Sequence, residues 1–158
     1  MVEVDVKLSP NDLYDYNLRH TYTSMAGILA TLVGAVGALY GFYKSYWLLM
    51  IVGVILVFYT PIMLLLKSRQ AFALSPSLKN TLHYMMDENG LTISQGESSV
   101  TYTWDEIVKA VSTSRSIIVY TGKYNATIIP KKQVQDSLSI IIETISKNLD
   151  PKKNKIRS

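Results

Sequence analysis

The sequence has no cysteine among its 158 residues. A disulfide scaffold, a thiolate metal site and a cysteine nucleophile are therefore excluded. Charged residues are scarce as well, at 18% of the chain, whereas about 25% is usual in a soluble domain. The shortage is concentrated in residues 24–66, where Lys44 is the only charged side chain. This uncharged region is the strongest signal in the sequence.

Two uncharged segments, residues 24–43 and 46–66, flank Lys44 and Ser45. At 1.5 Å per helical residue, each segment is about 30 Å long, which matches the hydrocarbon thickness of a bilayer. Because only two residues separate the segments, the two helices must run antiparallel. We predict a transmembrane helical hairpin, and the alternative is a hairpin buried inside a soluble protein.

Small residues are frequent in the first apolar segment, and small side chains let helix backbones approach closely in lipid. Pro61 removes one backbone donor from the second segment and is predicted to kink it near its end. Two interpretations of the small residues stay open: contact with the second segment near Gly53, and a self-association face that makes a homo-oligomer. The helix-packing candidates are Ala26, Ala30, Gly34, Gly37, Ala38, Gly41 and Gly53.

Basic residues predict the orientation of the hairpin. Its tip carries one cation, whereas Arg19 precedes the first segment and Lys67, Arg69 and Lys79 follow the second. Cytoplasmic loops carry the excess of Lys and Arg, so we expect a two-pass cell-membrane protein with its N- and C-termini in the cytoplasm. Residues 67–158 hold 13 Lys and Arg against 8 Asp and Glu, which favours membrane lipids as a partner. A cleaved signal peptide is not expected, because the first residues are acidic.

The segment before the hairpin combines a strand pattern with a helix start. Apolar and charged residues alternate over residues 2–8, as they do in a half-buried strand. Ser9, Pro10 and Asp12 then have the types and spacing of a helix N-terminus. A lone strand needs a sheet to join, so its partner is expected downstream of the hairpin.

Short β-rich runs separated by turn signals fill much of residues 80–130, and their spacing predicts an antiparallel meander. After Pro130, apolar residues recur on one helical face as far as Leu149. We therefore predict a membrane α-helical hairpin plus an α+β cytoplasmic domain. In that domain a strongly curved antiparallel sheet is capped by a C-terminal amphipathic helix and joined by the N-terminal strand. The predicted strands are residues 81–86, 91–94, 100–104, 109–113, 117–120 and 126–129.

The predicted organisation of the chain has five parts. The membrane hairpin separates a short N-terminal piece from the main cytoplasmic domain, and a basic tail follows that domain. The parts are residues 1–23 (strand and short helix), 24–66 (hairpin), 67–79 (linker), 80–150 (sheet-and-helix domain) and 151–158 (tail).

Three short motifs lie in this layout: Gly90 in "ENGLTIS", Trp104 and Ile107 in "TWDEI", and Pro130 in "IIPKK" before a C-terminal helix. Behind two apolar segments, these motifs resemble the YcxB-like family of bacterial two-span membrane proteins. The chain departs from the family pattern at one position. A basic residue and then an aromatic residue are expected after "PK", and here the basic Lys132 is followed by Gln133. The resemblance implies structural roles for these motif residues and a domain similar to pleckstrin-homology folds, a half barrel capped by a helix. It implies no activity.

The stretch "TWDEI" also places two adjacent carboxylates, Asp105 and Glu106, beside Trp104. Neighbours on an extended chain point to opposite faces, whereas an acid–base pair must converge on one atom. We therefore expect a structural corner in which Trp104 packs against the C-terminal helix and Ile107 returns to the core. His20 and His83 have no partner at metal-ligand spacing, and no phosphate-loop or dinucleotide motif is present. We expect no catalytic, cofactor or metal site, and no enzyme.

Basic residues are the candidates for contact with lipid or with a partner. The tail is interpreted either as a solvated, disordered end or as a segment attracted to anionic headgroups. No aromatic–basic platform for nucleic acid is present. The candidates are Lys109, Arg115, Lys123, Lys131, Lys132, Lys152, Lys153, Lys155 and Arg157.

The leading hypothesis for function is a non-enzymatic, membrane-anchored interaction module with an unidentified protein partner. Two alternatives stay open: an immunity protein that protects the cell against a membrane-active peptide, and a scaffold that senses anionic lipid. An enzyme is the least favoured class, because no convergent set of polar residues is recognisable.

Overall fold

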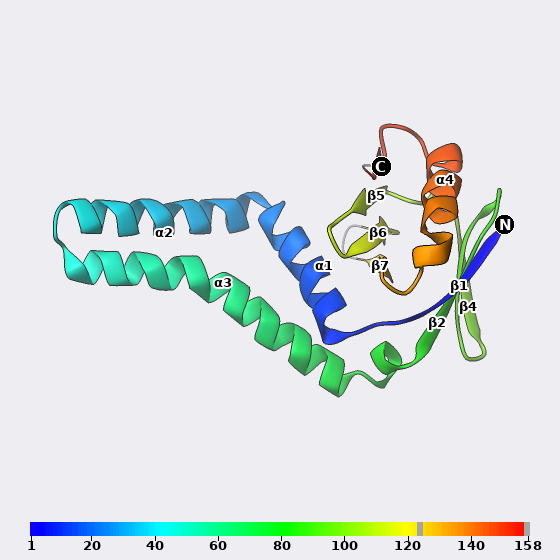
Figure 1. The fold of residues 1–158 in the computed structure, drawn as a ribbon, viewed down its shortest axis with the longest axis horizontal. Coiled ribbons are helices and arrows are strands. Elements are labelled where there is room, and N and C mark those ends of the chain that lie inside the picture. Colours follow the sequence, from blue (N-terminus) through cyan, green and yellow to red (C-terminus); the bar gives the residue numbers. More distant parts are fainter. Residues whose placement is uncertain (123–124, 157–158) are drawn as a thin grey trace.

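The structure, a computed structural model, describes residues 1–122 and 125–156. Two long helices, α2 (Met25–Tyr43) and α3 (Trp47–Leu74), form a hairpin that projects from a body of strands and shorter helices (Figure 1). Both helices are long and apolar enough to cross a membrane. Three of their four ends lie within one residue of the ends of the uncharged segments, and the C-terminal end of α3 lies further along the chain than expected.

The turn between the two helices is very tight. Ser45 adopts a left-handed conformation with φ 58°. The N–H of Tyr46 then donates to the carbonyl of Gly41 at 2.8 Å, and the N–H of Ser45 to the carbonyl of Phe42 at 3.2 Å. These two bonds are those of a Schellman motif, which satisfies the last carbonyls of a helix. The chain can therefore reverse within the two residues that separate the apolar segments.

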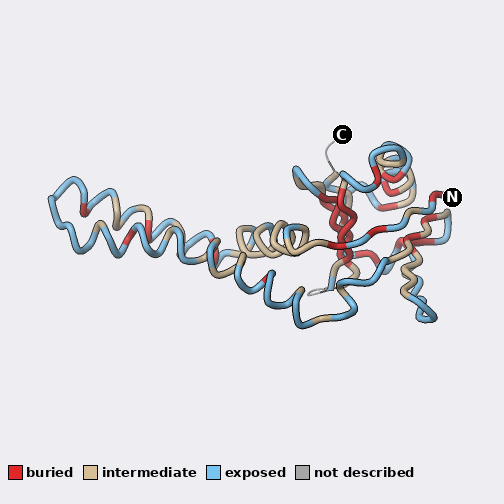
Figure 2. Tube along the Cα trace, turned by 60° about the horizontal axis from the view of Figure 1, so that its bottom comes forward, coloured by how far each residue is buried: buried red, intermediate tan, exposed pale blue. Residues whose placement is uncertain are grey.

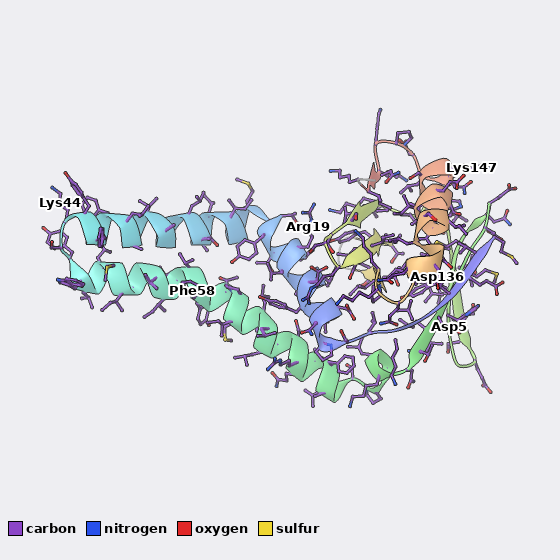
Figure 3. The ribbon with its side chains drawn as sticks, in the orientation of Figure 1. Asp5, Arg19, Lys44, Phe58, Asp136 and Lys147 are labelled. Carbon is purple, nitrogen blue, oxygen red and sulfur yellow. The ribbon has the colours of Figure 1, made fainter. Side chains whose placement is uncertain are left out.

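Helix α3 does not end where the apolar run ends. It continues through Lys67 to Leu74 and is followed by a short 3₁₀ helix, η1 (Pro76–Lys79), so most of the stretch expected as a linker is helical. Pro61 lies inside the helix, and Figure 1 shows α3 changing direction part-way along its length. The kink near Phe58 (Figure 3) falls in the later part of the uncharged segment, and it is in mid-helix because α3 continues to Leu74.

The first sheet has the order β1-β2-β3-β4 and is antiparallel throughout. The N-terminal strand joins it as expected, with Val2 opposite Met86 and Lys7 opposite Thr81. Gly90 opens β3, where an added Cβ would lie 2.1 Å from the carbonyl oxygen of Tyr102. That close approach to β4, rather than a positive φ, is the reason for glycine here. The strands are β1 (Val2–Lys7), β2 (Thr81–Met86), β3 (Gly90–Gln95) and β4 (Ser98–Thr103).

The second sheet has the order β7-β6-β5-β8. Three of its strands continue the expected meander, but β8 pairs with β5 in parallel, with Ala110 opposite Asn154. The prediction of one antiparallel sheet is therefore wrong in two respects: the strands divide into two sheets, and one pair is parallel. The strands are β5 (Lys109–Ser112), β6 (Ser116–Tyr120), β7 (Ala126–Pro130) and β8 (Asn154–Lys155).

One hydrophobic core lies between the two sheets and helix α4 (Leu138–Asn148). Val6, Leu91 and Ile117 come from the sheets, and Ile141 and Ile145 come from α4; all are at most 1% exposed. The buried residues of α4 lie on the face that the apolar periodicity predicted. Figure 2 shows the buried residues concentrated in this body, whereas the hairpin is mostly exposed.

Gln133 closes part of the gap between β1 and the turn after β7. Its side-chain nitrogen donates to the carbonyl of Lys7 at 2.6 Å, and its side-chain oxygen accepts from the N–H of Lys7 at 2.8 Å. An amide side chain can replace a strand neighbour in this way because it offers both a donor and an acceptor. The residue that departs from the expected family pattern therefore has a structural function.

Helix α1 (Pro10–Tyr22) lies between the sheet body and the lower part of α3 (Figure 1). It begins with the predicted capping box, in which Ser9 and Asp12 bond to each other through side chain and backbone. On one side Tyr16 contacts Tyr120 of β6, with ring centroids 6.1 Å apart. On the other side Asn17 donates to the hydroxyl of the fully buried Ser68 of α3 at 2.9 Å. Through these contacts α1 connects the hairpin to the sheets.

Candidate basic cleft at the hairpin junction

The stretch with the two carboxylates is a structural corner. Trp104 is 7% exposed and its indole N–H donates to the carbonyl of Asp87 at 3.0 Å. Glu106 turns back and accepts from the N–H and the hydroxyl of Thr103, at 2.8 and 3.0 Å. Ile107 is fully buried, as expected. Asp105 and Glu106 are exposed, and Glu106 is bonded back to Thr103, which fits the expected corner.

Residues Arg115, Lys131 and Lys132 are brought together by two turns. Arg115 lies in the turn between β5 and β6, and the two lysines follow β7. The N–H of Lys131 donates to the carbonyl of Arg115 at 2.8 Å, and its ammonium donates to the carbonyl of Thr113 at 2.6 Å. These two bonds join the turns. All three cations line one cavity of about 400 Å³, together with the start of α1 and Pro130.

A neighbouring cavity of about 420 Å³ lies between α1, α3 and Arg115. Asn11 and Arg115 line both cavities, so the two hollows meet at these residues. We call the combined hollow the basic cleft. Its other side chains from the helices are Ser9, Asp12, Tyr14, Asp15, Leu18, Leu65 and Arg69.

Both carboxylates of the basic cleft are engaged by neighbouring hydroxyls. Asp12 accepts from the hydroxyl of Ser9 at 2.6 Å, and Asp15 accepts from the hydroxyl of Thr113 at 2.6 Å. The second of these bonds joins α1 to the turn that carries Arg115. The acidic side chains therefore hold the walls of the cleft in place.

The remaining basic candidates that the structure describes lie elsewhere. The ammonium of Lys109 lies over the ring of Tyr120, 4.5 Å from its centroid, which is the geometry of a cation–π contact. Lys153 donates to the carbonyl of Asp105 at 2.8 Å. Lys152 and Lys155 are exposed. Lys123 and Arg157 lie outside the described residues.

The tail is structured as far as Ile156, so the expectation of a disordered end is wrong for this part. Lys153 offers its carbonyl to the N–H of Ala110 at 3.0 Å, and strand β8 follows on the edge of β5. Ile156 is half-buried against the main core. Lys152 and Lys155 are thereby held on one edge of the second sheet.

The small residues of the hairpin divide into two groups. Gly34 and Gly41 are buried against α3, and Gly53 of α3 lies so close to α2 that an added Cβ would be 2.4 Å from the nitrogen of Ala38. Gly37 is also near this contact, since an added Cβ would lie 4.0 Å from the Cα of Gly53. Ala26 and Ala30 are exposed. The interpretation as contact near Gly53 therefore accounts for Gly34, Gly37, Ala38 and Gly41.

The two histidines have different surroundings. His83 faces the carboxylate of Asp5 across β1 and β2, with 2.8 Å between Nδ1 and Oδ1, and the side chain is 42% exposed. His20 stacks on Tyr16, with centroids 5.9 Å apart. Within residues 1–122 and 125–156, no group of three or more acidic, histidine or cysteine side chains has metal-binding geometry.

Two buried tyrosines, Tyr84 and Tyr120, place polar hydroxyl groups in the interior of the body. Burial raises the pKa of Tyr84 to about 12, while a hydrogen bond from Thr127 at 2.7 Å acts in the opposite direction. The Tyr84 hydroxyl donates to the carbonyl of Ile128 at 3.3 Å. Burial also raises the pKa of Tyr120, to which Tyr16 adds, while Arg19 lowers it. Tyr84 therefore ties β2 of the first sheet to β7 of the second.

Sequence patterns missed Arg69 and Asn11 as members of the basic cleft. Arg69 signalled only membrane orientation, and Asn11 carried no motif. One signal was available for Arg69, because it lies four residues after Leu65 and hence on the same helical face. Nothing local indicates that Arg115, distant in sequence, faces that position.

Residues 87–140 match the family model described as YcxB-like protein. The matched segment runs from the turn before β3 to the first part of α4 and covers about a third of the chain. It includes Gly90, Trp104, Ile107 and Pro130, on which the resemblance was based, and it confirms the resemblance to this family over the matched segment. No curated protein and no solved structure gives a match.

Proposed function

We propose that this chain is a non-enzymatic interaction module that is anchored in the cell membrane by α2 and α3. The YcxB-like segment would then be held at the cytoplasmic face, where it presents a binding surface to a partner. The proposal rests most heavily on one observation, the inverted packing of the hairpin, in which apolar side chains point outward and glycines point inward.

The exposed surface of the hairpin supports lipid as its surroundings. Leu32, Val33 and Val36 of α2 are 54–64% exposed, and Ile55 and Phe58 of α3 are 56% and 58% exposed. Water-soluble proteins rarely expose continuous apolar surfaces of this extent. A core helix of a soluble protein would instead be covered by its own body, which lies at one end of the hairpin (Figure 1).

Charge at the two ends of the hairpin supports a cytoplasmic body. The tip carries Lys44 alone, whereas Arg19 lies in α1 and Lys67 and Arg69 lie in the later part of α3. Figure 1 shows both parts near the sheets. Excess Lys and Arg next to membrane spans stays on the cytoplasmic side. Figure 3 labels Lys44 and Arg19 at these opposite ends. Both ends of the chain would then be cytoplasmic, in a two-pass topology.

The arrangement of the body supports a binding module of the pleckstrin-homology kind. Two packed sheets and helix α4 share a core, and cavities lie at the junction of this body with the hairpin. Fold alone does not define a ligand, so the partner must be argued from surface chemistry.

Membrane extraction and protease access test this proposal on the full chain. In cells, the wild type is expected to stay in the membrane pellet after an alkaline carbonate wash, and protease added outside sealed cells should leave the body intact. Release by carbonate, or cleavage of the body from outside, would contradict the proposal.

A matched pair of variants sharpens the test. Ile55→Asp places a charge on the exposed face of α3, and Val100→Asp places one on β4, where the side chain is 51% exposed. A charge within a membrane span costs about 3 kcal/mol of insertion free energy, whereas an exposed strand position costs little. Only Ile55→Asp is expected to lower the membrane-bound fraction, and equal behaviour of the two variants would count against a lipid-exposed α3.

A further inference from the structure

The basic cleft holds more positive charge than its own carboxylates balance. Four cations line it: Arg69, Arg115, Lys131 and Lys132. They face two carboxylates, each already bonded to a hydroxyl. Only Lys131 has its charged group fixed by the protein, on the carbonyl of Thr113. For the side chains of Arg69, Arg115 and Lys132, the described part of the chain provides no ion pair or hydrogen bond within bonding distance.

The position of the cleft along α3 sets its depth relative to a membrane. Leu65 lies within the last turn of the uncharged segment, and Arg69 lies one helical turn further along the same face. If the hairpin spans a bilayer, as the proposed function states, the hydrocarbon region ends near this turn. Headgroup phosphates lie immediately outside the hydrocarbon, which is where Arg69 begins the cleft.

The chemistry of the free cations fits a phosphate group. A guanidinium offers parallel N–H donors that match two phosphate oxygens, and a lysine adds a point charge. Arg69 and Arg115 approach the cleft from α3 and from the β5–β6 turn, so one phosphate between them would connect the hairpin to the sheets. The Asn11 amide, common to both hollows, adds a neutral donor.

We propose that the basic cleft binds the phosphate of an anionic phospholipid of the cytoplasmic leaflet, through Arg69, Arg115 and Lys132. The bound phosphate pairs with cations that the protein leaves unpaired and offsets part of their charge, and it fixes the body against the membrane surface. This inference depends on the proposed membrane anchoring, and it assigns a ligand class and a position that the family match does not supply.

The tail offers no comparable site. Lys109 already lies over Tyr120, and Lys153 is bonded to the carbonyl of Asp105. Lys152 and Lys155 are exposed and line none of the cavities described above. They are therefore suited to serve as a control that removes the same charge without touching the cleft.

Native mass spectrometry of the full chain in detergent tests the inference. Phosphatidylglycerol and phosphatidylcholine are titrated against the wild type, an R69Q/R115Q variant and a K152Q/K155Q variant. Loss of a hydrogen bond to a charged group costs about tenfold in affinity. We expect a preference for phosphatidylglycerol in the wild type and in K152Q/K155Q, and a loss of at least about tenfold in R69Q/R115Q.

The outcomes separate the source of the phosphate. Absence of a preference for phosphatidylglycerol, or an equal loss in both double variants, overturns the inference in favour of general electrostatic attraction. If inorganic phosphate at millimolar concentration displaces phosphatidylglycerol and raises the melting temperature of the wild type but not of R69Q/R115Q, the cleft binds a soluble phosphate group, and the lipid assignment is overturned.

A carbonate wash separates this inference from the anchoring proposal. R69Q/R115Q is expected to stay in the membrane pellet, because both side chains lie outside the uncharged segments. If the wild type stays in the pellet but shows no lipid preference, only the inference fails. If the wild type is released, the anchoring proposal fails first. Circular dichroism of R69Q/R115Q checks that the variant is folded.

Discussion

The hairpin and the sheet body differ in which residues they bury and which they expose. In the body, most buried positions hold large apolar or aromatic residues, and Ser116 and Thr127 are buried polar residues among them. In α2 and α3, the buried positions are Gly27, Gly34, Gly41, Gly53 and Ser68, and the large apolar side chains face outward. In water, burial of apolar surface drives folding, whereas in lipid close approach of small residues replaces that drive. The contrast is the one expected if, as proposed, the hairpin lies in lipid and the body lies in water.

The body should depend on its large buried side chains. Ile145 and Ile140 are on the same helix, α4, and are 0% and 49% exposed. Ile145→Ala removes apolar contact at the centre of the core and should cost about 3 kcal/mol. Ile140→Ala should cost less than about 0.5 kcal/mol. Hydrogen exchange at the amides of β2 and β6 in the full chain measures both, and similar acceleration by the two variants would mean that α4 does not cover the core.

The hairpin should depend on the absence of side chains instead. Gly53→Ala places a methyl group 2.4 Å from the nitrogen of Ala38 and 2.6 Å from the carbonyl oxygen of Gly34. These are backbone atoms, so the helices must separate, at a cost of about 1–3 kcal/mol. The same change at Gly37, whose nearest atoms are 4.0 Å away, should be neutral or slightly stabilising, because alanine is the better helix former.

Titration of the detergent-solubilised chain with sodium dodecyl sulfate, followed by circular dichroism, compares the two hairpin variants. The midpoint for Gly53→Ala should fall below that of the wild type, and the midpoint for Gly37→Ala should not. A lower midpoint for both variants would mean that α2 also makes a close contact through Gly37, either with another part of α3 or with a second copy of the chain.

Local patterns in the sequence predict the elements whose signals are local. Strand β2 occupies residues 81–86 as predicted, because alternation and its turn are both contained in that stretch. The helix start at Ser9 and Asp12 is confirmed for the same reason. The two uncharged segments likewise carry their own length and polarity, so the hairpin needs no long-range information.

Features that depend on distant partners could not be predicted in this way. Strand β8 has two polar residues, and only its pairing with β5 makes it a strand. Helix α3 continues beyond Leu66 although its side chains become polar, because α1 packs beside this part and bonds to Ser68. The basic cleft forms because Arg69 of α3 and Arg115 of the β5–β6 turn line the same cavity. No periodicity in the sequence predicts that these two distant residues lie close together.

The smallest expected effect concerns a polar contact between the two sheets of the body. Tyr84→Phe removes the hydroxyl that bonds to Thr127 and Ile128 between the two sheets. The Thr127 hydroxyl loses its acceptor, so the free energy of unfolding should fall by about 1–2 kcal/mol at neutral pH. Hydrogen exchange at the β7 amides of the full chain measures this loss, and Thr127→Val in the Tyr84→Phe background should recover part of it.

The loss should depend on pH in a defined direction. The pKa of Tyr84 is about 12 in the folded chain, above its value of about 10 in an unfolded chain. The stabilisation by the neutral hydroxyl is therefore complete below pH 10 and is lost as the pH rises through 12. The wild type should approach the Tyr84→Phe variant in stability over this interval, because the other tyrosines titrate in both. If the stability difference between the wild type and Tyr84→Phe stayed constant to pH 12, the Tyr84 hydroxyl would be exposed to water, and the contact between the two sheets would not be buried.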